Sequence, residues 1–264
     1  MIIPGFSLIS PANEILNLPM HSGPDMVYHV SIVIPVYNGS RLLKEHLPPL
    51  LAWLENKPYK TQVIVVDDGS ADRDKTAAFA HENNLLFWGL TANKGKGAAL
   101  RKGFAHAEAP IQLFTDADIP FLHTNIDTLV SVIEKDPGQL IIGDRTDPRS
   151  VYFDAASPLR NWGSNLVSAL ARRYIMSDIR DTQCGLKGMG KDVALQLFGD
   201  SFIDRFAIDI ELICLAAKKN IPVRKIPVQL RYNDKSSIRL VKDGAKLLLD
   251  IYRIRSIHGK RTRK

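Results

Sequence analysis

Two aspartates on alternate residues, Asp116 and Asp118, are the side chains of this sequence best suited to hold a metal ion. They come shortly after residues 111–114, a largely apolar segment that is typical of a buried strand. Carboxylate oxygens are the ligands that Mg²⁺ and Mn²⁺ prefer, and both ions commonly share their coordination with substrate phosphates. The motif therefore indicates chemistry on a phosphorylated substrate. Because Asp after a strand also forms ordinary turns, that alternative stays open for the motif alone.

Two further polar groups follow apolar runs in the same way. Asp67 and Asp68 come directly after residues 63–66, and Asp144 with Arg145 ends another run. In open α/β sheets the ligand lies at the carboxyl ends of the strands. Charged residues at three strand ends therefore favour one shared site.

A loop rich in lysine and glycine precedes a predicted helix and reads Asn93-Lys94-Gly95-Lys96-Gly97. Backbone N–H groups at a helix N-terminus attract anions, and the lysine charges add to this attraction, so we expect this loop to favour an anion. The loop is not a P-loop, and no Gly-x-Gly-x-x-Gly follows the first strand. Both absences argue against an ATPase and against a dinucleotide-dependent dehydrogenase.

The elements that must position these residues alternate between apolar strands and amphipathic helices, which predicts an α/β fold with a mostly parallel central sheet and helices on both faces. Strands are expected at residues 30–35, 63–66, 85–90, 111–114 and 140–142. Helices are expected at residues 42–54, 76–81, 97–107, 126–134 and 238–254, the first of them interrupted or restarted at Pro48 and Pro49. The predicted domains are an irregular extension (1–27), a catalytic domain (28–237) and a basic C-terminal helix and tail (238–264).

The composition is that of an ordinary globular protein. Of the 264 residues, 45% are hydrophobic and 24% are charged, which excludes a chain that is entirely disordered, collagen-like or coiled coil. Two cysteines cannot form a disulfide framework or a cysteine-rich zinc site, and they suggest a reducing compartment. Neither a secretory signal nor an apolar run of about 18 residues is present. We therefore expect a cytoplasmic protein, with a peripheral position at the cytoplasmic membrane face left open.

The charge is unevenly distributed along the chain. Residues 218–264 carry a balance of +12, whereas residues 1–217 carry −5. A basic end suggests an anionic partner, or else a solvated tail. The acidic strand ends argue against nucleic acid, so no nucleic-acid partner is expected. The apolar and basic residues of the predicted C-terminal helix favour contact with an anionic membrane, with a solvated cap on the domain as the alternative.

Four motifs, in this order and at these distances, resemble glycosyltransferase family 2: Ile34-Pro35-Val36-Tyr37-Asn38, Val65-Val66-Asp67-Asp68-Gly69-Ser70, Asn93-Lys94-Gly95-Lys96-Gly97 and Asp116-Ala117-Asp118. The stretches at residues 179–187 and 205–212 are similar to the branch of dolichyl-phosphate β-glucosyltransferases and polyprenyl-phosphate sugar synthases. This resemblance covers roughly residues 31–252. It implies a GT-A fold, an inverting mechanism, a nucleotide-sugar donor of the UDP-glucose or GDP-mannose type, and Mg²⁺ or Mn²⁺.

The resemblance also implies roles for individual residues. Donor binding would fall to Pro35, Tyr37, Asp67, Asp68, Lys94, Lys96 and Asp116. Asp116 and Asp118 would hold the metal. Arg145 and Arg160 would bind the acceptor phosphate, while Gln183 and Asp209 would face the sugar or the acceptor. Asp209 is the candidate base if the acceptor is a hydroxyl, which must lose a proton.

The leading function is thus transfer of a hexose, with glucose as the first candidate, to a polyprenyl phosphate. Such a phosphate is already an anionic nucleophile and needs no general base. One alternative is a family 2 enzyme acting on a saccharide or another hydroxyl. A second is a nucleotidyltransferase, which would release pyrophosphate. A third is a non-catalytic nucleic-acid-binding protein, whose binding would weaken steeply with salt.

Overall fold

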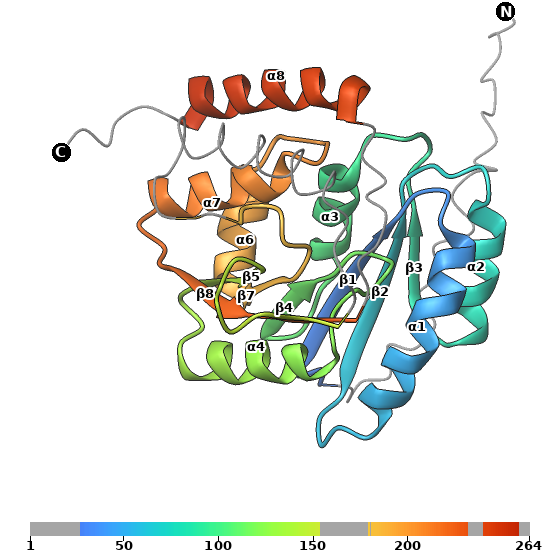
Figure 1. Ribbon diagram of the computed structural model, residues 1–264. Coiled ribbons are helices and arrows are strands. Elements are labelled where there is room, and N and C mark those ends of the chain that lie inside the picture. The colour runs from blue at the N-terminus through green and yellow to red at the C-terminus, as the bar shows by residue number, and fades with distance from the viewer. Residues whose placement is uncertain (1–26, 154–178, 180, 232–239, 259–264) are drawn as a thin grey trace, which may run out of the picture.

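A seven-stranded sheet forms the centre of the protein, with the strand order β3-β2-β1-β4-β7-β5-β8 (Figure 1). The computed structural model describes residues 27–153, 179, 181–231 and 240–258. The strands of the sheet are β1 (Val30–Val36), β2 (Thr61–Asp67), β3 (Leu86–Gly89), β4 (Ile111–Phe114), β5 (Leu140–Asp144), β7 (Lys187–Gly190) and β8 (Val223–Pro227). Only β7 is antiparallel to its neighbours within this sheet. The expected mostly parallel sheet is confirmed. Two short strands, β6 (Val151–Tyr152) and β9 (Gln229–Leu230), pair separately.

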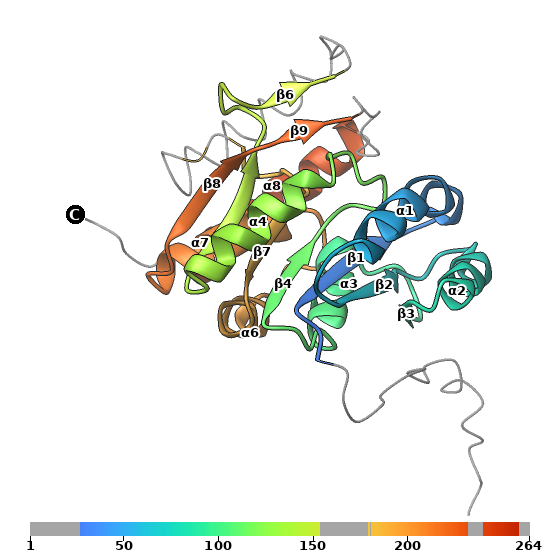
Figure 2. The same cartoon turned by 90° about the horizontal axis from the view of Figure 1, so that it is seen from below.

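Helices cover both faces of the sheet, as expected (Figures 1 and 2). One apolar cluster includes side chains of α1 (Ser40–Glu55), α2 (Arg73–Glu82) and α4 (Thr124–Lys135). The other includes side chains of α3 (Lys96–Phe104), α6 (Lys191–Asp200), α7 (Ile208–Lys218) and α8 (Leu240–His258). Within β1, Ile32 and Ile34 belong to the first cluster and Val33 to the second. Burial on both faces is the reason why these strands read as continuous apolar runs.

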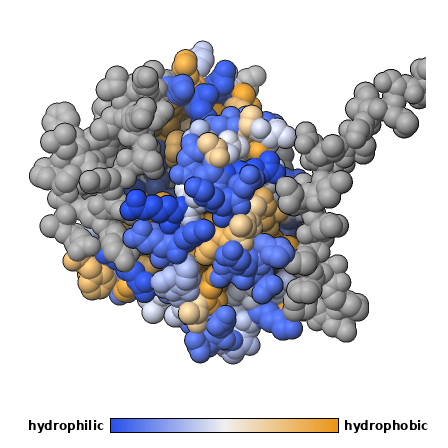
Figure 3. All heavy atoms as spheres, turned by 90° about the vertical axis from the view of Figure 1, so that its right-hand side faces the viewer, coloured by the Kyte–Doolittle hydropathy of each residue, from blue (hydrophilic) through white to orange (hydrophobic). Residues whose placement is uncertain are grey.

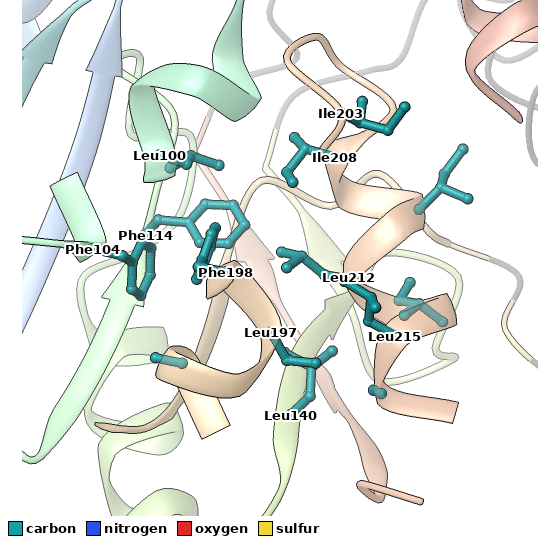
Figure 4. Close-up of a cluster of buried hydrophobic side chains, with 14 of the residues drawn as sticks. Leu100, Phe104, Phe114, Leu140, Leu197, Phe198, Ile203, Ile208, Leu212 and Leu215 are labelled. Atoms are coloured by element: carbon teal, nitrogen blue, oxygen red, sulfur yellow. The ribbon is translucent and has the colours of Figure 1, made fainter. Parts of the chain in front are cut away.

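The second cluster fixes the helices that carry site residues (Figure 4). Phe104 of α3 stacks on Phe198 of α6, with ring centroids 3.9 Å apart. Phe114, the last residue of β4, meets Phe104 edge-on at 6.1 Å. The start of α3 at Lys96 is therefore held at a set position relative to the strand that leads into Asp116.

The expected interruption of the first helix is wrong, because α1 continues through Pro48 and Pro49. Both prolines lie on its exposed face, while Leu43, Leu47 and Leu50 are fully buried. A proline leaves one carbonyl without its N–H partner, but on the exposed face water can bond that carbonyl. Burial of the leucine face then keeps the helix continuous. The side of the molecule that carries α1 and α2, at the right in Figure 1, shows a mixture of hydrophilic and hydrophobic residues at its surface (Figure 3).

The C-terminal helix α8 packs on α7 through Leu247, Ile251 and Ile254, which are at most 8% exposed. It extends beyond the expected end at residue 254 to His258. The expected extension at residues 1–27 falls almost wholly outside the described residues, and the three-part division of the chain stays a prediction. Within the described ranges, no helix has both the length and the apolar character that a bilayer-spanning helix requires.

Candidate active site

The carboxyl ends of β2, β4 and β5 meet at one edge of the sheet, because β4 and β5 are both antiparallel to β7 and so share a direction. Asp67 and Asp68 stand at the end of β2, and Asp116 comes two residues after β4. Asp144 ends β5, and Arg145 follows it. The charged residues predicted to share a rim therefore do share one.

Two turns meet at the β1–β2 part of this edge. The backbone N–H of Asn38 donates to Ser70 Oγ at 2.8 Å, and the N–H of Ala71 donates to Asn38 Oδ1 at 2.9 Å. Tyr37 is 54% exposed beside this cross-link, and Pro35 is half-buried. These hydrogen bonds join the two predicted nucleoside-binding segments into one unit.

Asp67 and Asp68 are both buried but have different partners. Asp67 Oδ1 accepts from the Ser70 N–H at 2.9 Å, while its buried Oδ2 has no hydrogen-bond partner among the described residues. Asp68 accepts from the backbone N–H groups of Lys94 and Gly95 at 2.8 and 2.7 Å. Burial raises the pKa of Asp68, although these two hydrogen bonds oppose the shift. Asp68 thus anchors the lysine-rich loop, and Asp67 retains an acceptor atom that a ligand N–H could use.

The lysine-rich loop corrects one expectation. The N–H groups of Gly97 and Ala98, at the start of α3, donate to the carbonyl of Asp204 at 2.7 and 3.1 Å. Gly97 permits this approach, because a Cβ there would overlap the carbonyl of Ile203. Together with the bonds to Asp68, this occupies four of the backbone N–H groups that were expected to attract an anion. If the loop binds an anion, its lysine side chains must supply most of the attraction, and Lys94 is exposed.

A row of alternating charges leads from the edge into the core. Lys96 Nζ lies 2.8 Å from Asp116 Oδ1 and 3.0 Å from Asp209 Oδ2. Lys187 Nζ lies 2.6 Å from Asp209 Oδ1 and donates to the Cys184 carbonyl at 2.7 Å. Side-chain exposure falls from 42% at Asp116 to 9% at Lys96, 4% at Asp209 and zero at Lys187. We name these four residues the charge row.

Opposite charges on either side keep Lys96 and Asp209 ionised. Burial alone would lower the pKa of Lys96, but the charges of Asp116 and Asp209 outweigh it and raise that pKa. Burial would likewise raise the pKa of Asp209, but Lys187 and Lys96 outweigh it and lower that pKa. Asp209 is thus a weak base with an ammonium group on each oxygen. A proton from an acceptor hydroxyl would have to displace one of these lysines.

The Asp116 carboxylate is in close contact with the backbone at Gly185. Gly185 lies so close that a Cβ at this residue would overlap Asp116 Oδ2. Among the described residues, no three or more His, Cys, Asp or Glu side chains gather in a way that would hold a metal. Two carboxylates that leave coordination positions for water and phosphate suit Mg²⁺ or Mn²⁺, so Asp116 and Asp118 fit the expected metal.

Arg145 forms a two-bond ion pair with Asp181. Arg145 Nε and Nη2 donate to Asp181 Oδ2 and Oδ1 at 2.8 and 2.7 Å, and the Arg145 backbone N–H donates to Oδ2 at 2.9 Å. Burial would raise the pKa of Asp181, but Arg145 outweighs it and lowers that pKa. Gln183, two residues further on, is half-buried. Arg160 lies outside the described residues.

Two residues of this site, Lys187 and Asp181, were not assigned roles from the sequence, although both lie in the stretch at residues 179–187. A lysine between Leu186 and Gly188 in a buried strand was a signal that could have been used, because a fully buried lysine needs a charged partner. Glu211, two residues after Asp209, has other partners. It accepts from the Phe202 and Ile203 N–H groups and pairs with His258 at 3.0 Å.

Comparison with known proteins identifies the family of this chain and several relatives. The family model described as glycosyl transferase family 2 matches residues 31–198. A dolichyl-phosphate beta-glucosyltransferase of Trichomonas vaginalis is 27% identical over 241 residues, covering 86% of this chain and 72% of the relative. The enzyme of the same name from Drosophila melanogaster is 30% identical over 225 residues, covering 79% and 69%.

Among solved structures, glucosyl-3-phosphoglycerate synthase from Mycobacterium tuberculosis with Mn²⁺, uridine diphosphate and phosphoglyceric acid superposes with a TM-score of 0.68. Its sequence is 16% identical, and the match covers 89% of this chain and 80% of that one. At this identity the likeness concerns the fold, and it confirms the expected GT-A architecture.

Proposed function

Because the chain belongs to glycosyl transferase family 2, we propose that it is an inverting, metal-assisted glucosyltransferase that moves glucose from UDP-glucose to a polyprenyl phosphate of the dolichyl type. The observation that carries the proposal is the charge row, in which Lys96 and Asp116 stand at the edge of the sheet beside the Asp67–Asp68 turn. The names of the relatives supply the donor sugar and the class of acceptor.

The donor nucleoside would bind at the two linked turns. Asp67 Oδ2 is a buried acceptor without a partner in the described residues, and such an atom is costly unless a ligand donates to it. A uracil or guanine ring offers ring N–H donors of this kind. Tyr37 is exposed beside it and offers an aromatic face for a base or a ribose. Pro35 and Asp68 would hold these turns in place.

Departure of the nucleoside diphosphate develops negative charge, which the site must stabilise where it forms. A divalent metal, held by Asp116 and Asp118, would supply that charge stabilisation when bound. Lys96 forms an ion pair with Asp116 and is kept protonated by the carboxylates of Asp116 and Asp209. It therefore adds a fixed positive charge beside the proposed metal site. Lys94 would approach the diphosphate from the exposed side of the loop.

The acceptor phosphate would attack the anomeric carbon directly, opposite to the leaving diphosphate, and so invert its configuration. An ionised phosphate needs no general base, which agrees with Asp209 being neutralised by two lysines. Arg145 would grip the phosphate with charge-assisted hydrogen bonds while Asp181 fixes the plane of its guanidinium group. Arg160 and Gln183 are proposed to complete the acceptor site.

The proposal also assigns the protein to the cytoplasm, with a peripheral position at the cytoplasmic face of a membrane, where a lipid acceptor presents its phosphate. The described residues offer one surface for such contact, on α8, and its argument follows in the next subsection.

The test is a transfer assay with dolichyl phosphate and radiolabelled UDP-glucose or GDP-mannose, each with Mn²⁺ or with a chelator. We expect labelled lipid and free UDP from UDP-glucose with Mn²⁺, and loss of both in Asp118→Asn. Labelled lipid from GDP-mannose alone would overturn the donor. Release of pyrophosphate would overturn the reaction class, and label in a saccharide but not in lipid would overturn the acceptor.

A further inference from the structure

Within residues 246–258, the outward face of α8 carries apolar and basic side chains and no acidic ones. Among residues 246–258 the exposed ones are Lys246, Leu248, Leu249, Tyr252, Arg253, Arg255, Ser256 and Ile257. Four of them are large and apolar, and their exposed fractions are 48% for Leu248, 61% for Leu249, 71% for Tyr252 and 54% for Ile257. Asp250, the acidic residue of this stretch, is 3% exposed and faces the protein.

Polar contacts at two points fix the rotation of α8 about its axis. Asp250 accepts from Arg205 Nη2 and Nε at 2.8 and 3.1 Å. Two turns further along, His258 Nε2 lies 3.0 Å from Glu211 Oε1, and Glu211 is fully buried. The helix is therefore held with one face inward, and the opposite face is presented to the surroundings (Figure 1).

The spacing gathers Leu248, Leu249 and Tyr252 into an apolar patch with basic neighbours. Leu248 and Tyr252 are four residues apart and lie on the same side of the helix, with Leu249 next to them. Lys246 and Arg253 lie along one border of this patch, and Arg255 lies along the other. An apolar centre with basic borders is the pattern of a helix that lies flat at a membrane surface. We name the exposed residues of 246–257 the α8 face.

We propose that the α8 face binds an anionic lipid surface. Charge complementarity selects this occupant, because residues 218–264 carry a balance of +12 and the α8 face contains no acid to oppose an anionic headgroup. A second copy of the chain is the competing occupant. Two α8 faces packed on each other would bring the cations of both copies together, which is unfavourable.

The role of this membrane contact rests on the proposed function, because that function supplies the lipid acceptor. The binding itself is argued from the side chains of the α8 face alone. Arg205, which pairs with Asp250 of α8, is four residues before Asp209 of the charge row. Contact of α8 with the membrane would bring the acceptor side of the enzyme to the depth at which a polyprenyl phosphate presents its headgroup.

The test measures cosedimentation of the purified full chain with phosphatidylcholine vesicles, with and without phosphatidylglycerol, at low and at high salt. We expect binding to the anionic vesicles at low salt only. Leu249→Ser should weaken it about tenfold or more through lost apolar burial. Lys246→Gln should weaken it about fivefold through the loss of one charge. The matched controls are Leu195→Ser on α6, at 60% exposure against 61%, and Lys44→Gln on the exposed side of α1; both should bind as wild type does.

Several results would overturn the inference: no binding to anionic vesicles at low salt, equal binding by wild type and Leu249→Ser, or a dimer that Leu249→Ser dissociates in place of vesicle binding. Transfer of glucose to a short, water-soluble prenyl phosphate separates this inference from the proposed function. A protein that transfers glucose but ignores vesicles contradicts only the lipid surface. A protein that binds vesicles but transfers nothing supports the α8 face and contradicts only the reaction.

Discussion

Lys96 Nζ lies 2.8 Å from Asp116 Oδ1, so the carboxylate predicted to hold a metal ion is already neutralised by an ammonium group of the same chain. The same lysine is held 3.0 Å from Asp209 Oδ2, which keeps it in place. A divalent ion that approaches Asp116 alone must therefore repel or displace a cation. A metal that arrives with a nucleotide diphosphate brings negative charge for Lys96 to meet. Metal and nucleotide should bind better together than apart.

Replacing Lys96 with Met should raise the affinity for Mn²⁺ alone and lower the affinity for UDP. Each change should be about tenfold, the size of one charge-assisted hydrogen bond. Titration of free Mn²⁺ by electron paramagnetic resonance measures the first, and calorimetry with UDP measures the second. Lys102→Met is the control, because Lys102 lies on the same helix but contacts the Trp88 ring. Unchanged Mn²⁺ affinity in Lys96→Met would show that the ammonium group does not compete with the metal.

Gly185→Ala should abolish metal-dependent nucleotide binding, because the new Cβ would overlap Asp116 Oδ2. Wild-type protein at 100 times the dissociation constant of UDP with Mn²⁺ should gain about 2.7 kcal/mol of stability, and the variant should gain none. Thermal unfolding with and without UDP and Mn²⁺ provides the measurement. Gly199→Ala on α6 is the matched control, because its Cβ meets nothing within 4 Å. A normal ligand shift in Gly185→Ala would argue against Asp116 as the metal carboxylate.

The sheet edge could be predicted from the sequence because it depends on local runs. Residues 111–114 are apolar except for Gln112 and end shortly before Asp116, and β4 has these bounds. Parallel strands then place Asp67, Asp116 and Asp144 together without further information. By contrast, β7 contains one lysine and two glycines, so it carries no strand pattern. It is a strand because β4 and β5 lie on either side of it, and Lys187 is tolerated there because Asp209 pairs with it from 22 residues away.

The hydrogen-bond partners of the lysine-rich loop could not be predicted from the sequence either, because one of them is distant along the chain. The Asn93–Gly97 segment could be recognised as an anion-binding loop from its lysines and glycines. The N–H groups of Lys94, Gly95 and Gly97 are nevertheless bonded to Asp68 and to the Asp204 carbonyl. The Asp204 partner comes from a segment more than a hundred residues away, and its approach depends on Gly97. No pattern within the loop indicates such a partner.

Lys187→Met should destabilise the protein by about 3–5 kcal/mol, because it leaves one oxygen of the buried Asp209 without its charged partner. Adding Asp209→Asn should recover part of this loss, since the two residues act as a pair. Urea unfolding of the two single variants and the double variant gives the free energies of unfolding. Lys191→Met is the control at an exposed residue on α6 and should change stability by less than about 0.5 kcal/mol. Additive losses would indicate that Lys187 is not coupled to Asp209.

Stability should fall as the pH is lowered from about 6.5 to about 4, in part because of His123. This histidine is 6% exposed and lies 5.6 Å from the Trp53 ring. Burial, followed by the charge of Arg231, lowers its pKa from 6.5 to about 4. In this window the unfolded chain binds a proton that the folded chain does not, so the free energy of unfolding decreases as pH falls. His123→Gln should flatten this part of the pH profile of the urea midpoint. His81→Gln, at an exposed residue, should leave the profile unchanged.

Asp181→Asn should raise the KM for the polyprenyl phosphate about tenfold while changing the KM for UDP-glucose little. The two hydrogen bonds that Asp181 accepts from Arg145 Nε and Nη2 set the plane of the guanidinium group, and loss of the carboxylate charge leaves that group free to turn. The chain offers a matched control in Asp147→Asn, because Asp147 accepts from Arg149 Nε and Nη2 at 3.0 and 2.8 Å in the same two-bond geometry. Arg149 is 74% exposed, so that pair is screened by water and should contribute little to stability or to turnover. A rise in both KM values for Asp181→Asn, or an equal rise in Asp147→Asn, would contradict a specific role of Arg145 at the acceptor.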